Sequence, residues 1–172
     1  MARAFRSVHP YDDTDVIDAR APRTNQAFVG LVALAAFVFD APLLVALVAL
    51  QLAVGLVFGR RFCLPCVFYF EVLQPRLGEG PIEDARPPRF ANMLGLGFTA
   101  LATVAFLAGL ETLGWVLALV VAALALLAAA TGFCLGCELY AFVARRRGVR
   151  LVGRRGGLRA WTRVCAWSWR SR

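Results

Sequence analysis

AFVGLVALAAFVFDAPLLVALVALQLAVGLVF, residues 27–58, is apolar or glycine at every position except Asp40 and Gln51. One helix over this run would be about 48 Å long at ~1.5 Å per residue, against a bilayer hydrocarbon core of ~30 Å. The sequence Asp40-Ala41-Pro42 supplies a break, because proline inside a helix removes a hydrogen bond. The run therefore predicts two helices, over about residues 24–39 and 43–58, joined by a tight turn.

A second apolar run covers residues 90–133, and its only charged residue is Glu111. Two helices of about spanning length fit it, over about residues 90–110 and 113–132. Backbone polar groups inside lipid must be paired within their own segment, so helices are the expected structure. The two runs together predict an all-α integral membrane protein with four transmembrane helices.

The composition agrees with that class. Of the 172 residues, 60% are hydrophobic and 17% are charged, whereas a soluble domain carries about a quarter charged residues. The net charge of +8 would suggest nucleic acid as the partner of a soluble protein. Cytoplasmic flanks of membrane helices collect Lys and Arg as well, so we expect the lipid bilayer as a partner and no nucleic acid. No cleavable signal peptide is expected at the start of this sequence.

Each apolar run lies between two short boxes. An Asp-Ala-Arg-x-Pro-Arg box precedes it, at residues 18–23 and 84–89, and a Phe-Cys-Leu-x-Cys box follows it, at residues 62–66 and 133–137. Asp18 and Asp84 are 66 positions apart, while Cys63 and Cys134 are 71 apart. The pattern predicts a tandem repeat of one two-helix unit, with both copies in the same orientation. The predicted parts are a polar tail (1–17), repeat 1 (about 18–73), repeat 2 (about 84–147) and a basic, Trp-rich tail (148–172).

Charge predicts the orientation. The expected turns around Asp40 and Glu111 contain no Lys or Arg, whereas the side that holds the four boxes also holds many arginines, among them Arg61, Arg76 and Arg145. Positive charge collects on the cytoplasmic side. We therefore expect a multi-pass protein of the cell membrane, with both termini and all four boxes in the cytoplasm.

The two cysteine pairs, Cys63/Cys66 and Cys134/Cys137, are the candidate site, and three interpretations compete. In the first, each pair is a catalytic redox dithiol, because a cysteine at a helix start near arginines becomes a reactive thiolate. Arg60 and Arg61 precede the first pair, so we expect the second pair to be less acidic. In the second, the four thiolates hold one zinc ion or iron–sulfur cluster. In the third, the cysteines only pack helix ends.

The Asp-Ala-Arg-x-Pro-Arg boxes predict helix starts, where aspartate accepts hydrogen bonds from free amides and proline fits the first turn. The four arginines are then interfacial anchors, or, in the alternative, an anion-binding site at the helix N-termini. They are Arg20, Arg23, Arg86 and Arg89. The sequence holds no phosphate loop, Ser/His/Asp set or zinc-protease pattern, so it names no enzyme class.

The boxes resemble those of the bacterial membrane family that carries the domain of unknown function 4395. The resemblance covers about residues 18–147. It implies a thiol-dependent redox or sulfur-handling protein, with a thioredoxin-like or sulfurtransferase protein as partner, since such genes are neighbours of the family in actinobacterial genomes. A metal-binding protein or transporter that uses the same thiols is the alternative, and a scaffold without chemistry is the third class. The positions that carry the resemblance are Asp18, Arg20, Pro22, Arg23, Cys63 and Cys66, and then Asp84, Arg86, Pro88, Arg89, Cys134 and Cys137.

Overall fold

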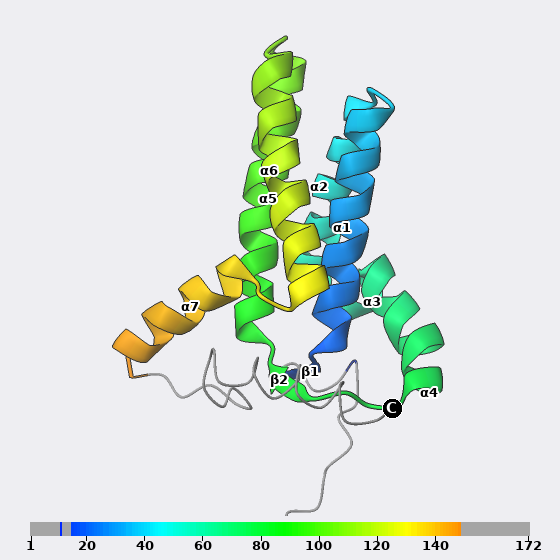
Figure 1. The fold of residues 1–172 in the computed structure, drawn as a ribbon, viewed down its shortest axis with the longest axis vertical. Helices are drawn as coiled ribbons and strands as arrows, with labels where there is room; N and C mark the ends of the chain where they lie inside the picture. Colours follow the sequence, from blue (N-terminus) through cyan, green and yellow to red (C-terminus); the bar gives the residue numbers. More distant parts are fainter. Residues whose placement is uncertain (1–10, 12–14, 149–172) are drawn as a thin grey trace, which may run out of the picture.

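The computed structural model describes Tyr11 and residues 15–148, and this part of the chain is mostly helical. Four long helices run side by side in an elongated bundle (Figure 1). They are α1 (Arg20–Val38), α2 (Pro42–Val57), α5 (Arg86–Leu107) and α6 (Glu111–Thr131). Each lies close to where the apolar runs predict a helix. The expectations for the two tails fall largely outside the described residues.

The predicted turns join the helices of each pair. Asp40 is exposed and has a positive φ of 48°, and Pro42 follows as the first residue of α2. Proline fits there because its missing N–H has no partner in the first turn of a helix. Gly109 takes the left-handed conformation, with a φ of 74°, just before α6. The breaks predicted near Asp40 and Glu111 are confirmed.

Helices from the two halves of the chain pack against each other along the bundle. α1 lies against α6, and α2 lies against α5, in addition to the contacts within each hairpin. Small buried residues such as Ala36, Ala102 and Ala118 allow this close approach around Val45. Gly30 has the same role, since a Cβ there would lie 2.7 Å from a Leu126 side-chain atom.

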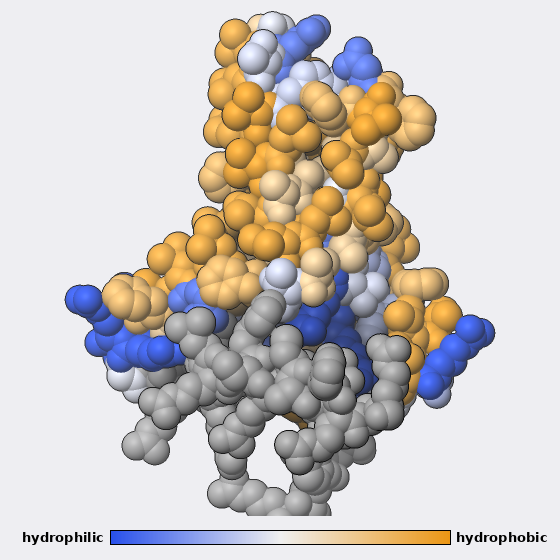
Figure 2. All heavy atoms as spheres, viewed as in Figure 1, coloured by the Kyte–Doolittle hydropathy of each residue, from blue (hydrophilic) through white to orange (hydrophobic). Residues whose placement is uncertain are grey.

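The outside of the bundle is apolar. Figure 2 shows hydrophobic side chains along its length, with hydrophilic ones at its base and a smaller group at the opposite tip. Among the described residues, α5 and α6 are long and apolar enough to cross a membrane, and α2 is a shorter apolar helix.

A two-stranded antiparallel ribbon closes the base of the bundle (Figure 1). Strand β1 (Val16–Asp18) pairs with β2 (Ile82–Asp84), with Ile17 opposite Glu83. The Ala19 amide donates to the Pro81 carbonyl, and the Ala85 amide donates to the Asp15 carbonyl, both at 2.9 Å. The sequence did not predict these strands. They place the two Asp-Ala-Arg-x-Pro-Arg boxes next to each other.

Two helical arms leave the base of the bundle on different sides (Figure 1). The first follows α2 through a 3₁₀ turn, η1 (Arg60–Phe62), and continues as α3 (Leu64–Phe68), a π-helical turn, η2 (Tyr69–Leu73), and α4 (Gln74–Leu77). The second is α7 (Leu135–Arg146), which follows α6. Each arm begins at a cysteine box.

Candidate functional site

The first cysteine of each box is the N-cap residue of its arm. Cys63 precedes α3 with φ −84° and ψ 100°, and Cys134 precedes α7 with φ −97° and ψ 110°. The Cys63 carbonyl accepts from the Val67 amide at 2.9 Å, and the Cys134 carbonyl accepts from the Glu138 amide at 3.0 Å. The two boxes therefore have the same backbone geometry. The Cys134 sulfur also accepts from the Cys137 amide at its helix start, whereas the Cys63 thiol makes no such cap hydrogen bond.

The two cysteine boxes differ only at the residue before the second cysteine, which is Pro65 in the first and Gly136 in the second. Pro65 lies in the first turn of α3, where its missing N–H is harmless. Gly136 takes the same place in α7, which packs on α5. A Cβ at Gly136 would lie 3.0 Å from both the Cα and the Cβ of Ala91. Glycine is therefore needed for this close contact between the second arm and the bundle.

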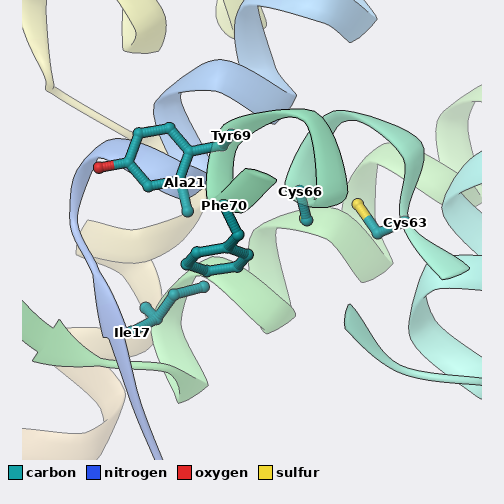
Figure 3. Close-up of a cluster of buried hydrophobic side chains, with 6 residues drawn as sticks. All are labelled: Ile17, Ala21, Cys63, Cys66, Tyr69 and Phe70. Carbon is teal, nitrogen blue, oxygen red and sulfur yellow. The ribbon is translucent and has the colours of Figure 1, made fainter. Parts of the chain in front are cut away.

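The cysteines of the first pair are free and buried, with exposed fractions of 6% for Cys63 and 8% for Cys66. Figure 3 shows them beside Phe70 and Tyr69 of the same arm, with Ile17 and Ala21 completing the cluster.

Two amide side chains from the bundle contact the sulfur of Cys63. The thiol donates to Asn25 Oδ1 at 3.7 Å, and Gln51 Nε2 donates to the sulfur at 3.8 Å. Asn25 in turn donates to Asn92 Oδ1 at 3.2 Å. These contacts hold the Cys63 sulfur against α1 and α2, and Asn92 links Asn25 to α5.

The pKa values of the two thiols of the first pair are shifted in opposite directions. The pKa of Cys63 is lowered because its thiolate accepts hydrogen bonds from the Cys66 thiol and the Cys66 amide, although burial opposes the shift. The pKa of Cys66 is raised because its thiol donates to Cys63 and is buried. Of the two thiols, Cys63 is therefore the one that ionises more readily.

The second pair is less buried, and Cys134 is its acidic member. Its pKa falls to about 7, mainly because the thiolate accepts from the Cys137 thiol. The Cys137 amide, which lies 3.3 Å from the Cys134 sulfur, the Gln26 side chain and the Gly136 amide lower the pKa further. Burial opposes them.

The expectation that the second pair is less acidic is wrong. Hydrogen bonds, and not arginine charge, lower the pKa of Cys63, and the Arg60 charge lowers only that of Cys66. Cys134 accepts from more donors and is less buried than Cys63. Local donors therefore decide the order of acidity.

The aspartates of the boxes hold the helix starts, as predicted. Asp18 Oδ1 accepts from the Arg20 amide, and Asp84 Oδ1 accepts from the Arg86 amide, both at 2.9 Å. Asp18 Oδ2 also accepts from the Tyr69 hydroxyl at 2.8 Å and from the Gly80 amide at 2.7 Å. One buried carboxylate thus joins α1, the first arm and the segment that leads into β2.

Three of the four box arginines lie against backbone. Arg20 Nη1 donates to the Leu77 carbonyl at 3.3 Å, and Arg89 Nη2 donates to the Leu56 carbonyl at 3.5 Å. The guanidinium of Arg23 lies directly against Gly132, the residue that ends α6. Arg86 is exposed at the start of α5. Their roles as interfacial anchors or anion ligands remain predictions.

Each cysteine pair faces the Arg-containing box of the other half of the chain. The cavity beside Cys63 and Cys66 has a volume of about 460 Å³ and includes Arg89 and Asn92 in its lining. A smaller cavity, about 90 Å³, lies beside Cys134 and Cys137 and is lined by the matching residues Arg23 and Gln26. The two cavities share Ile17, Pro22 and Pro88. The candidate site is therefore built from both halves, and its two parts adjoin.

A shared four-cysteine metal site finds no support in this geometry. Within Tyr11 and residues 15–148, no group of three or more His, Cys, Asp or Glu side chains could hold a metal ion. Each pair on its own supplies two thiolates, which are fewer than the four of a zinc or iron–sulfur site.

Sequence reasoning missed the uncharged polar residues around the thiols, which are Asn25, Gln26, Gln51 and Asn92. It also missed Tyr69, whose hydroxyl donates to the buried Asp18 carboxylate. A signal was available, because amide side chains are rare in apolar helices and need partners there. All four lie toward the cysteine end of their helices.

The fold and the site define a mostly helical protein with two Cys-x-x-Cys pairs at the starts of helical arms. The family described as "Domain of unknown function (DUF4395)" matches residues 17–145, and the chain belongs to this family. The match includes all four boxes and confirms the resemblance noted in the sequence. Comparison with curated proteins and with solved structures found no match.

Proposed function

We propose that the protein crosses the cell membrane four times, as two copies of a helical hairpin, and uses its two cysteine pairs for thiol-dependent redox or sulfur chemistry. In this proposal the thiols and both termini lie on the cytoplasmic side. A thioredoxin-like or sulfurtransferase protein is the proposed exchange partner.

The bundle surface supports the membrane location. α5 and α6 are long and apolar enough to span, and α1 and α2 pack along them. Large apolar side chains are exposed on all four helices, among them Leu31, Leu50, Leu101 and Val120. Soluble proteins rarely expose contiguous apolar surface of this extent (Figure 2). Lipid would cover it.

The base of the bundle supports two copies in one orientation. The ribbon pairs Val16 with Asp84 and Asp18 with Ile82. A shift of 66 positions takes Val16 to Ile82 and Asp18 to Asp84, so the two pairings are equivalent. The contact of α1 with α6 likewise matches that of α5 with α2. A rotation axis along the bundle would relate the halves in this way, as expected for a parallel repeat.

The arms support an interfacial position for the thiols. Exposed apolar residues, among them Phe68 on the first arm and Phe142 on the second, accompany exposed Arg76 and Arg145. In Figure 2 the hydrophilic residues lie at the outer ends of both arms. Amphipathic helices of this kind lie at a membrane surface, and arginine favours the cytoplasmic one.

One observation carries the chemical part of the proposal: each box presents an acidified first thiol at a helix start and a second thiol three residues later. A thiolate in this position attacks a disulfide or persulfide sulfur, and the second thiol then displaces the bound group. The proposed catalytic residues are Cys63 with Cys66, and Cys134 with Cys137.

Redox titration of the full chain in membranes tests the proposal. The fifth cysteine of the chain, Cys165, is first changed to serine. After equilibration in thiol–disulfide buffers of stepped potential, free thiols are blocked and disulfides are then reduced. The cysteines freed in this way, which had been oxidised, are counted by mass-tagged alkylation. We expect two mass tags to be gained together at each pair. Cys66→Ser and Cys137→Ser should each abolish one of these transitions and leave the other. If neither pair forms a disulfide at any accessible potential, the redox function is refuted.

A further inference from the structure

A cavity of about 460 Å³ lies beside Cys63 and Cys66. We propose that this cavity binds a small, anionic, short-chain disulfide, which oxidises Cys63 and Cys66. This inference rests on the proposed redox function and adds the substrate class. It is carried by the cavity's size, charge and walls.

The size of the cavity suits a small molecule. Its volume of about 460 Å³ falls in the range of ~300–1,000 Å³ typical of ligand pockets. The matching cavity beside Cys134 and Cys137, at about 90 Å³, is too small for such a ligand. The two pairs therefore differ in what can reach them, although their backbone geometry is the same.

The charge of the cavity selects an anion. Its lining contains Arg60, Arg61 and Arg89, and no Asp or Glu belongs to it among the described residues. The Tyr11 hydroxyl, also in the lining, donates to Glu71 at 3.1 Å, and the Arg61 guanidinium lies 5.7 Å from the centre of the Tyr11 ring. Three guanidinium groups around one cavity favour carboxylate, sulfonate or phosphate groups.

The other residues that line the cavity indicate what the uncharged part of the ligand should be. Leu52, Leu56 and Val57 give an apolar side, which suits a short aliphatic chain. Asn25, Gln51 and Asn92 add amide groups near the Cys63 sulfur. A compact molecule with an acidic end and a sulfur–sulfur bond satisfies both kinds of wall.

The reaction is a thiol–disulfide exchange in which the ligand is the oxidant. The Cys63 thiolate attacks one sulfur of the ligand, the ligand's sulfur–sulfur bond breaks, and one ligand thiolate leaves. The Cys66 thiol then gives its proton to the departing group and displaces the second ligand thiolate from Cys63. The products are a Cys63–Cys66 disulfide, one ligand thiolate and one ligand thiol, so the electron pair passes from the cysteines to the ligand.

Matched disulfides of different charge test the inference. The full chain, with Cys134, Cys137 and Cys165 changed to serine, is placed in nanodiscs of zwitterionic lipid. Formation of the Cys63–Cys66 disulfide is followed with anionic dithiodipropionate, neutral hydroxyethyl disulfide and cationic cystamine. We expect the anionic reagent to react about tenfold faster than the cationic one, as for a ligand guided into a charged cleft.

Arginine variants separate the cavity from the general positive charge of the surface. Arg89→Gln should slow the anionic reagent about fivefold and leave the neutral one unchanged. Arg76→Gln, at an exposed arginine of the first arm outside the cavity, is the matched control and should change neither rate. If Arg89→Gln also slows the neutral reagent, the lost hydrogen bond from Arg89 to the Leu56 carbonyl could be the cause. Arg61→Gln keeps that hydrogen bond, and it must then slow the anionic reagent without slowing the neutral one.

The outcomes distinguish the two proposals. Equal rates for the three reagents, or an Arg76→Gln effect as large as that of Arg89→Gln, would overturn the substrate class and leave the redox function intact. No oxidation of the pair by any reagent in excess would overturn both.

Discussion

The acidity of Cys134 gives the sharpest test of the site. With a pKa of about 7, half of this thiol is ionised at pH 7, whereas an ordinary cysteine with a pKa of about 8.5 is only ~3% ionised. Alkylation by iodoacetamide follows the thiolate. In the unmodified chain, we expect the pH–rate profile of Cys134, resolved by peptide mass spectrometry, to have its midpoint near pH 7. At pH 7, Cys134 should react before the three other cysteines of the boxes.

Removing one donor should shift this profile. Cys137→Ala takes away the largest cause of the lowered pKa, and a hydrogen bond to a charged group is worth about 1.5 kcal/mol. The rate at pH 6, relative to the high-pH plateau, should therefore fall about tenfold. Gln26→Leu should act in the same direction on Cys134 only, whereas Gln51→Leu should affect only Cys63. A midpoint near that of a free thiol, or no response to Cys137→Ala, would refute the assignment.

Three further predictions concern stability and topology. Gly136→Ala should destabilise the protein by about 1–3 kcal/mol in thermal unfolding, because its Cβ would press on α5, while Gly97→Ala, which meets open space, should be neutral. Tyr69→Phe should cost about 1–3 kcal/mol, since it leaves the buried Asp18 carboxylate short of a donor, and Tyr140→Phe, whose ring contacts Phe90, should cost less in the same denaturation assay. An impermeant maleimide should label single cysteines of both pairs from the cytoplasmic side only; labelling from opposite sides would contradict the parallel repeat.

The long helices could be predicted because the apolar runs are long and are broken at only two places. The ribbon could not, since three-residue strands have no periodic signal and exist only because the two boxes meet. The arms begin where the sequence placed helix ends, but their course depends on packing, as at Gly136 on Ala91. Composition therefore located the bundle, while tertiary contacts determined its base.

The candidate site shows the same division. The cysteines were found from their spacing, but their order of acidity was not, because it depends on which side chains donate to each sulfur. Neighbouring arginines in the sequence suggested Cys63, whereas Gln26, far from Cys134 in the sequence, contributes to the larger shift. Contacts between residues this distant along the chain cannot be derived from box spacing.

Each thiol pair is completed by residues of the other half of the chain: Arg89 and Asn92 beside Cys63, and Arg23 and Gln26 beside Cys134. A change in the arginine box of either half therefore alters the surroundings of the opposite cysteines. The two cavities differ in volume, about 460 against 90 Å³, although the two boxes have the same backbone geometry. Under the proposed function, this difference would leave one pair with a substrate cavity and the other as the more exposed, more acidic thiol suited to a protein partner.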